Sequence, residues 1–180
     1  MLPDVTTPDI PPLTFRHTLA CFATGVTVVT TAMGDGLLED DGLVHGMTAN
    51  AFSAVSLDPP LVLLAIACHS HMHQWLQHSE RFGISILAQD QVHLARHFAG
   101  QHPEQELAVA FERVHGYPLI PGALAYLICK VWQTYEVGDH TLFLGRVEFL
   151  HQGRENRAPL LFYRSSYPSL AVIEAERSIP

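Results

Sequence analysis

Two neighbouring stretches near the middle of the chain, residues 45–57 and 61–67, have the pattern of β-strands. The first, HGMTANAFSAVSL, is rich in small and hydroxyl-bearing residues, whereas the second, LVLLAIA, is apolar throughout. Asp58-Pro59-Pro60 separates them, and proline cannot donate the N–H hydrogen bond that a central strand requires. The pattern therefore predicts one strand, a turn and a second strand that is fully buried.

Apolar residues at helical spacing predict four helices, and strand-like runs predict five further strands. The expected helices are 15–22 after Thr14, a segment through 75–78 after Ser70, 91–100 after Asp90, and a segment around 107–114 after His102-Pro103. The expected strands are 25–33, 82–88, 124–137, 141–150 and 160–163. Gly138-Asp139 should turn the two long strands into a hairpin, and residues 117–122 should form a loop.

Many strands at short spacing with few helices between them favour a mainly β fold with peripheral helices. We expect a closed or split β-barrel; a doubly wound sheet fits poorly, because its strands and helices alternate. The first 13 residues contain four prolines and little periodicity. They predict an extended N-terminal arm before a single domain over residues 14–180.

The composition of the chain limits the classes of partner that it could bind. Hydrophobic residues make up 48% of the chain and charged residues 16%, which suggests that a partner subunit covers some apolar surface. A formal net charge of −8 argues against binding to nucleic acid or to an anionic membrane. No apolar run is long enough to span a bilayer, and the N-terminus lacks the features of a signal peptide. Cys21, Cys68 and Cys129 lie far apart in apolar patterns, so we expect them to be buried and the protein to be cytoplasmic.

The histidines of the HxHxH run, His69, His71 and His73, are the clearest candidate metal ligands. On a strand they would share one face. Alternatively, the run straddles a strand end and a helix start, which separates the three side chains; no cysteine or carboxylate lies nearby to complete a set. An anion beside the helix start at Ser70 fits this segment better than a metal.

Two further segments each have a structural and a functional interpretation. The small residues of Thr48-Ala49-Asn50-Ala51 would let the backbone approach a flat polar ring, or would simply pack tightly on a neighbouring strand. His140, after Gly138-Asp139, either completes a turn or is presented into a cleft as a donor or proton carrier. No Ser-His-Asp set and no phosphate-binding glycine loop is visible, so hydrolase and nucleotide-kinase functions have no support.

Five segments, in this order and spacing, resemble the flavin reductase-like family. This family comprises the short-chain NAD(P)H:flavin oxidoreductases that are reductase components of two-component flavin-dependent monooxygenases. The segments are FATGVTVVTT (22–31), HGMTANAFSAVSLDPPLVLL (45–64), FGISILA (82–88), LARHFAG (94–100) and GDHTLFLGRV (138–147). The resemblance covers about residues 15–167. It implies an FMN-binding split β-barrel that binds FMN or FAD, uses NADH or NADPH as co-substrate, and forms a homodimer.

The resemblance also implies site residues. The flavin-binding candidates are Thr24, Gly25 and Val26 beside the flavin; Thr48, Ala49, Asn50 and Ala51, whose backbone faces the isoalloxazine ring; Ser56 and Ser70 near the ribityl-phosphate side; Arg96 as a phosphate ligand; and the pair Tyr163 and Arg164 after the last strand. His140 is the catalytic candidate, beside the nicotinamide. Two departures matter: Ala51 and Ala54 stand where many relatives have serine, and the loop 37–43 is longer than usual.

The leading hypothesis is therefore an NAD(P)H-dependent flavin reductase that supplies reduced flavin to a partner monooxygenase. Such a reaction needs no protein nucleophile, because the cofactor accepts the hydride. Backbone N–H groups near Ala49–Ala51 would stabilise the negative charge that grows at N1 and O2 of the flavin. The alternative is a flavin-binding or electron-transfer protein of the same fold without reductase turnover.

Overall fold

The computed structural model describes residues 10–32, 44–101, 109–153 and 157–170. Its helices are α1 (Pro12–Leu19), α2 (His71–His78), the short 3-10 helix η2 (Gln89–Gln91) and α3 (Val92–Phe98). Its strands are β1 (Thr24–Gly25), β2 (Thr27–Ala32), β3 (Val44–Ala49), β4 (Phe52–Leu57), β5 (Pro60–Ala67), β6 (Arg81–Ile86), β7 (Glu112–Val114), β8 (Tyr117–Leu119), β9 (Ala125–Val137), β10 (His140–Gln152) and β11 (Leu161–Phe162).

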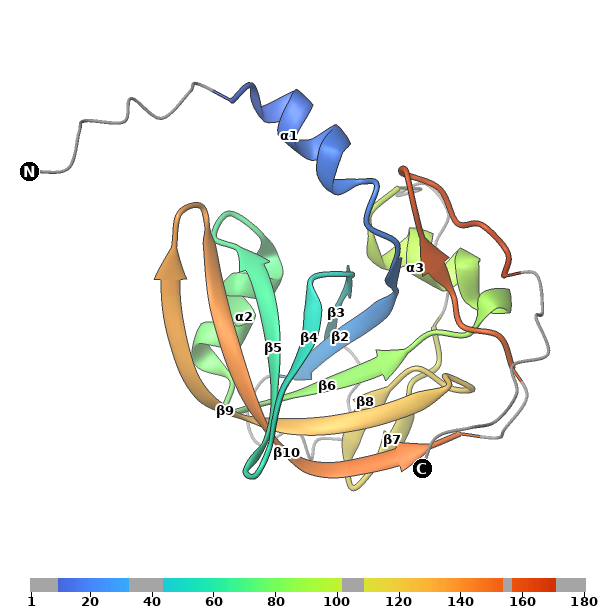
Figure 1. Cartoon of the computed structure of the whole chain (residues 1–180). Helices are drawn as coiled ribbons and strands as arrows, with labels where there is room; N and C mark the ends of the chain where they lie inside the picture. The colour runs from blue at the N-terminus through green and yellow to red at the C-terminus, as the bar shows by residue number, and fades with distance from the viewer. Residues whose placement is uncertain (1–9, 33–43, 102–108, 154–156, 171–180) are drawn as a thin grey trace, which may run out of the picture.

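A seven-stranded antiparallel sheet dominates the fold, with the strand order β3-β2-β6-β9-β10-β5-β4. The sheet curls strongly (Figure 1), but its two edge strands, β3 and β4, are not paired with each other, so the barrel is not closed. Two small antiparallel pairs, β1 with β11 and β7 with β8, lie outside it. The prediction of a mainly β fold with peripheral helices is confirmed.

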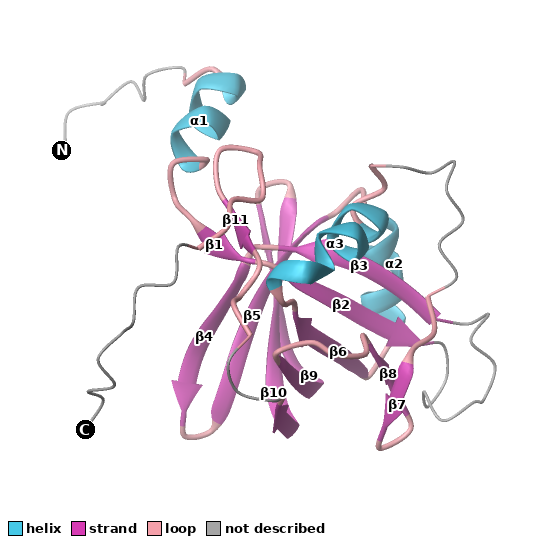
Figure 2. Ribbon diagram, turned by 90° about the vertical axis from the view of Figure 1, so that its right-hand side faces the viewer, coloured by secondary structure: helices cyan, strands magenta, loops and turns pink. Residues whose placement is uncertain are grey.

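The main core lies where the curled sheet meets α2. Phe82 and Phe143 are fully buried, and α2 adds Met72 and Leu76 to the same cluster. The backbone of β10 packs closely on the Phe82 side chain at Gly145, where a Cβ atom would lie 2.4 Å from Phe82 Cζ. A second cluster joins α3 to β2 and β11 and includes Val26, which lies between β1 and β2. Figure 2 shows α2 and α3 near β2 and β3, with β1 and β11 beneath α1.

The predicted strand over 45–57 is in fact two strands, β3 and β4, separated at Asn50 and Ala51. β5 is not fully buried as predicted, because only alternate residues (Val62, Leu64 and Ile66) face the core. This alternation is expected for an antiparallel sheet with one face on the core.

Several predictions for the helices and loops need correction. α1 begins earlier than expected, at Pro12 in its first turn, where the fixed φ of proline suits a helix start. The predicted arm 1–13 therefore overlaps α1 at its last two residues, and the rest of it up to residue 9 lies outside the described part. Asp90 does not cap α3; its carboxylate pairs with Arg157 instead. Residues 112–114 and 117–119, predicted as helix and loop, form the β7–β8 hairpin. Residues 102–108 lie outside the described ranges, as does the loop 37–43.

The cysteines differ from the prediction. Only Cys129 is buried, and its burial raises the pKa of the thiol to about 12. Cys21 and Cys68 are exposed, because both lie where the chain leaves a regular element: Cys21 after α1, and Cys68 after β5.

Candidate functional site

Thr24 and Gly25 form β1 and pair with β11, where Thr24 lies opposite Phe162 and Gly25 opposite Leu161. The Thr24 hydroxyl oxygen is buried and has no hydrogen-bond partner among the described residues. Beside it, a Cβ atom on Gly25 would meet no atom within 4 Å. Because neighbouring residues of a strand point to opposite faces, this space lies on the other face of β1 from the Thr24 hydroxyl. The open face at Gly25 is where a flat ligand could approach the backbone of β1 closely.

The segment after β3 lies close to β1. Ala49 is opposite Thr27, and the Thr27 hydroxyl donates to the Ala49 carbonyl oxygen at 2.7 Å. Asn50 and Ala51 are exposed where the chain passes to β4. Val26, by contrast, is 1% exposed; its side chain belongs to the core, so only its backbone is available to a ligand.

The end of β5 connects this segment to His140. The Ala65 N–H donates to the Ala51 carbonyl oxygen at 3.1 Å, and Ala67 pairs with His140. Residues 65 and 67 are two positions apart on one strand, or about 7 Å. In Figure 1 the β9–β10 turn, the β3–β4 link and β1 all lie toward the upper side of the curled sheet, below α1.

His140 begins β10, and its side chain is 42% exposed. Its Nδ1 atom lies 2.7 Å from Asp139 Oδ1. This hydrogen bond, together with the charge of the imidazole when protonated, lowers the pKa of the Asp139 carboxyl. Asp139 therefore orients one ring nitrogen of His140 and leaves the other available to a ligand.

Arg96 and Arg164 bring positive charge to the β11 side of the site. Thr48 donates to the Ala95 carbonyl oxygen at 2.7 Å, which fixes α3 on β3 next to Arg96. The Arg96 guanidinium lies 5.9 Å from the Tyr167 ring. The Arg164 guanidinium lies 5.3 Å from the Tyr163 ring, and its contact with Cys21 raises its pKa further. Both guanidinium groups are exposed side chains suited to an anionic group.

Ser70 lies near His140 but is occupied with the start of α2. Its hydroxyl accepts from the His73 N–H at 3.2 Å and donates to the Ala67 carbonyl oxygen at 2.8 Å. The predicted helix cap is thus confirmed. A ligand at this point would meet the remaining lone pair and the helix N-terminus.

Ser56 does not join the other predicted residues. It pairs with Leu61 near the β4–β5 turn, whereas His140 pairs with Ala67. Six positions along β5 separate the two, or about 20 Å. The β4–β5 turn lies at the opposite, lower end of the sheet in Figure 1.

The three histidines of the HxHxH run do not share a face. His69 lies in the turn before α2, His71 is exposed on the helix and His73 is buried. No group of three or more metal-binding side chains occurs within the described residues. His71 instead approaches His45, which stacks on Trp75 at 5.4 Å. Burial, followed by the charge of His71, lowers the pKa of His45.

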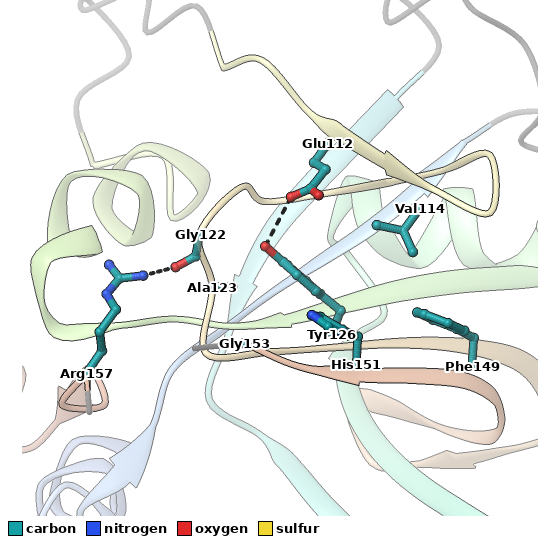
Figure 3. A pocket seen from close by; sticks show the side chains of 9 residues that line it. All are labelled: Glu112, Val114, Gly122, Ala123, Tyr126, Phe149, His151, Gly153 and Arg157. Carbon is teal, nitrogen blue, oxygen red and sulfur yellow. Dashed lines mark hydrogen bonds between the residues drawn. The ribbon is translucent and has the colours of Figure 1, made fainter. Parts of the chain in front are cut away.

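A cavity of about 580 Å³ lies elsewhere, between β7 and the outer ends of β9 and β10 (Figure 3). Tyr126 donates to Glu112 there at 3.3 Å and stacks on His151 at 6.1 Å. None of the predicted site residues lines this cavity.

In the described part of the chain, no helix is both long and apolar enough to cross a membrane.

The chain matches known proteins over most of its length. The family model described as "Flavin reductase like domain" covers residues 19–171. An NADH-dependent flavin reductase from Rhodococcus sp is 46% identical over 166 residues, which is 92% of this chain and 90% of that protein. The reductase subunit HsaB of a flavin-dependent monooxygenase from Rhodococcus jostii is 35% identical over 172 residues, 95% of this chain and 83% of that protein.

Solved structures agree with these matches. The flavin reductase PheA2 superposes with a TM-score of 0.81 at 43% identity, covering 91% of this chain and all (100%) of that chain. The NADH:FAD oxidoreductase SgcE6 from Streptomyces globisporus, solved with NAD and FAD fragments, has a TM-score of 0.78 at 38% identity, covering 88% of this chain and 92% of that chain. The chain therefore belongs to the flavin reductase-like family.

Proposed function

We propose that the chain is an NAD(P)H-dependent flavin reductase that reduces FMN or FAD and supplies the reduced flavin to a separate flavin-dependent monooxygenase. The observation that carries this function is the open space over Gly25 in β1, within the segment where the family resemblance places the flavin. In a chain of this family, a flavin in that space would lie directly against the backbone of β1. The fold would then serve as a split β-barrel with its flavin at the open side.

The residues around this space fit a flavin. Thr24, Gly25 and the exposed backbone of Asn50 and Ala51 would contact the ring, and Arg96 and Arg164 would bind phosphate at its β11 side. Backbone N–H groups near Ala49–Ala51 would stabilise negative charge on the ring. The flavin itself supplies the hydride-accepting chemistry. Ser70 would contact the bound ligand near His140. Ser56 is not included in the proposed site, because it pairs with Leu61 at the far end of β5.

His140 would hold the nicotinamide. Its imidazole is held by Asp139 at one nitrogen and is accessible at the turn next to the end of β5. A single positioned donor or acceptor there would orient the carboxamide of NADH or NADPH for transfer. This arrangement needs no acid–base pair of carboxylates.

We also propose that the protein is a homodimer and acts in the cytoplasm. None of the residues of α1 is buried, and Leu13, Leu19 and the following Phe22 are 64%, 56% and 76% exposed. α1 projects from the sheet in Figure 1. Apolar side chains in such a position are suited to the surface of a second copy, close to the proposed flavin site at β1.

The monooxygenase as recipient rests on the relatives. HsaB is the reductase subunit of a flavin-dependent monooxygenase, and a relative from Thermus thermophilus, 37% identical, is the reductase component of 4-hydroxyphenylacetate 3-monooxygenase. The net charge of −8 remains an argument against a nucleic-acid partner.

Steady-state assays separate this function from a flavin-binding protein without turnover. NADH and NADPH would each be mixed with FMN, FAD or riboflavin, and loss of the reduced-nucleotide absorbance would be followed with and without protein. A reductase accelerates at least one combination well above the background. No acceleration with any combination would overturn the proposal and favour an electron-transfer or storage role.

A further inference from the structure

We propose that His73, a buried histidine on α2, is a positioning residue that fixes the start of β10 and thereby holds His140 in place for NADH-dependent flavin reduction. The inference rests on the proposed role of His140. His73 itself would touch neither nucleotide nor flavin. Its part would be to fasten α2 to the strand from which the proposed nicotinamide contact projects.

The fastening point is a buried polar contact. His73 is 8% exposed, and its Nε2 atom lies 2.8 Å from the hydroxyl oxygen of Thr141, which is 4% exposed. The Cys68 sulfur lies 3.7 Å from the same hydroxyl. Breaking one side of such a contact leaves a buried polar group unsatisfied, which makes the contact costly to lose.

The His73 ring is itself held firmly. Its backbone N–H donates a hydrogen bond to the Ser70 hydroxyl at 3.2 Å, so the residue lies in the first turn of α2. Its ring packs edge-on against Phe143, with 5.8 Å between centroids. Phe143 is 1% exposed and belongs to the main core. His73 thus connects Thr141 to a rigid part of the molecule.

Thr141 transmits this support to His140 through the backbone. Neighbouring side chains on a strand point to opposite faces, and the burial pattern agrees: Thr141 faces the core, whereas the side chain of His140 is 42% exposed. On the other side of His140, the turn is held by the Cys68 N–H, which donates to the Asp139 carbonyl oxygen at 3.0 Å. The His73–Thr141 contact is therefore an inward attachment directly next to His140.

Removing the contact should weaken nucleotide use more than flavin binding. For His73→Leu and for Thr141→Val we expect kcat/KM for NADH to fall about three- to tenfold, since a loosened turn would hold His140 less well. The flavin Kd should change less than about twofold, because the flavin would be held at β1 and β3. Thr141→Ser, which keeps the hydroxyl, should restore wild-type kinetics. His78→Leu is the matched control, because His78 is exposed on the same helix and bonds only within it.

The decisive experiment combines these changes with His140→Ala. If His73 acts through His140, Thr141→Val should cost nothing further in kcat/KM once His140 is alanine. The inference is overturned if Thr141→Val gives wild-type NADH kinetics, or if it costs the same factor with and without His140. Thr141→Val is close to isosteric, so it serves if His73→Leu fails to fold. A wild-type protein that oxidises no NADH with any flavin would instead overturn the proposed function.

Discussion

At the scale of single residues, the proposed site depends on three residues of the family motifs, Thr24, Gly25 and His140. Thr24 has a hydroxyl that no described residue satisfies, and Gly25 leaves space that no described atom fills. His140 has one nitrogen engaged by Asp139 and the other available. The open space over the backbone of Gly25, within the family motif, is the strongest structural indication of where the flavin binds.

Gly25→Val tests the flavin position. The new side chain has room in the protein alone, so we expect little change in the free energy of unfolding. Because it would occupy the space assigned to the flavin, it should weaken FMN or FAD binding at least about tenfold. Flavin fluorescence titration and urea unfolding on both variants make the comparison. Unchanged flavin affinity in a folded Gly25→Val protein would place the flavin elsewhere.

His140→Ala tests the nucleotide side. A positioned hydrogen bond of this kind is worth about 1–3 kcal/mol, so kcat/KM for NADH should fall about ten- to a hundredfold. Flavin affinity should change little, because His140 is separated from β1 by the β3–β4 link and the end of β5. The measurements are steady-state kinetics and flavin titration. A mutant with tenfold weaker flavin binding and wild-type NADH efficiency at saturating flavin would contradict the assignment.

At the scale of elements, the sequence predicted the helices and hairpins whose ends are marked by a capping residue, a proline or a glycine. Ser70 capped α2 as expected, and the turns at Asp58-Pro59 and Gly138-Asp139 closed the hairpins β4–β5 and β9–β10. The break between β3 and β4 was missed because no proline or glycine marks Asn50-Ala51. The β7–β8 hairpin was missed because Val114 of β7 also fits helical spacing with the residues before it, and because the prolines of 117–122 favoured a loop over β8.

The site was predictable to the same extent. The residues near β1, near β3 and at His140 lie close together, as predicted. Each belongs to a short sequence motif that identifies its segment of the fold. Ser56 does not join them, because it lies beside the β4–β5 turn, about 20 Å along β5 from the position that pairs with His140. The contacts of His73 with Thr141 and of His45 with Trp75 join residues far apart in the chain, and no local signal indicates them.

The packing of α2 on β3 should make stability depend on pH. Burial lowers the pKa of His45 below its ordinary value of 6.5, so the unfolded chain binds a proton there more readily than the folded protein. The contribution of neutral His45 to the free energy of unfolding is therefore fully present above about pH 6.5 and is lost as the pH falls below that value. In urea unfolding at about pH 7.5 and about pH 5.5, His45→Phe should lose less stability on acidification than the wild type.

The matched control is His78→Phe, because His78 is exposed on α2 and is not among the groups that lower the pKa of His45. This variant should lose as much stability as the wild type on acidification. Equal losses in the wild type and in His45→Phe would show that the stacked His45 does not titrate with folding.

At the scale of the whole molecule, the sheet leaves apolar surface uncovered. α1 contributes Leu13 and Leu19, and the last residue of β4 contributes Leu57, which is 96% exposed. For a chain that is 48% hydrophobic with a net charge of −8, association of two copies would bury apolar side chains while leaving charge on the outer surface.

Leu13→Glu combined with Leu19→Glu tests this association. Both side chains are exposed in one subunit, so the fold should persist, but a carboxylate at an apolar interface should separate the copies. Light scattering should give twice 19.9 kDa for the wild type and a lower average mass for the double variant. A wild-type mass of 19.9 kDa at micromolar concentration would contradict the dimer.

The central claim is that this chain transfers hydride from a reduced nicotinamide nucleotide to a flavin. The most direct measurement is an anaerobic titration in which NADH is added to the protein with FMN or FAD, while loss of NADH and of oxidised flavin is followed together. The proposed function predicts that one flavin is reduced for each NADH consumed, at a rate that rises with protein concentration and falls in His140→Ala. Flavin reduction no faster with the protein than without it, for either flavin and either nucleotide, would contradict the claim.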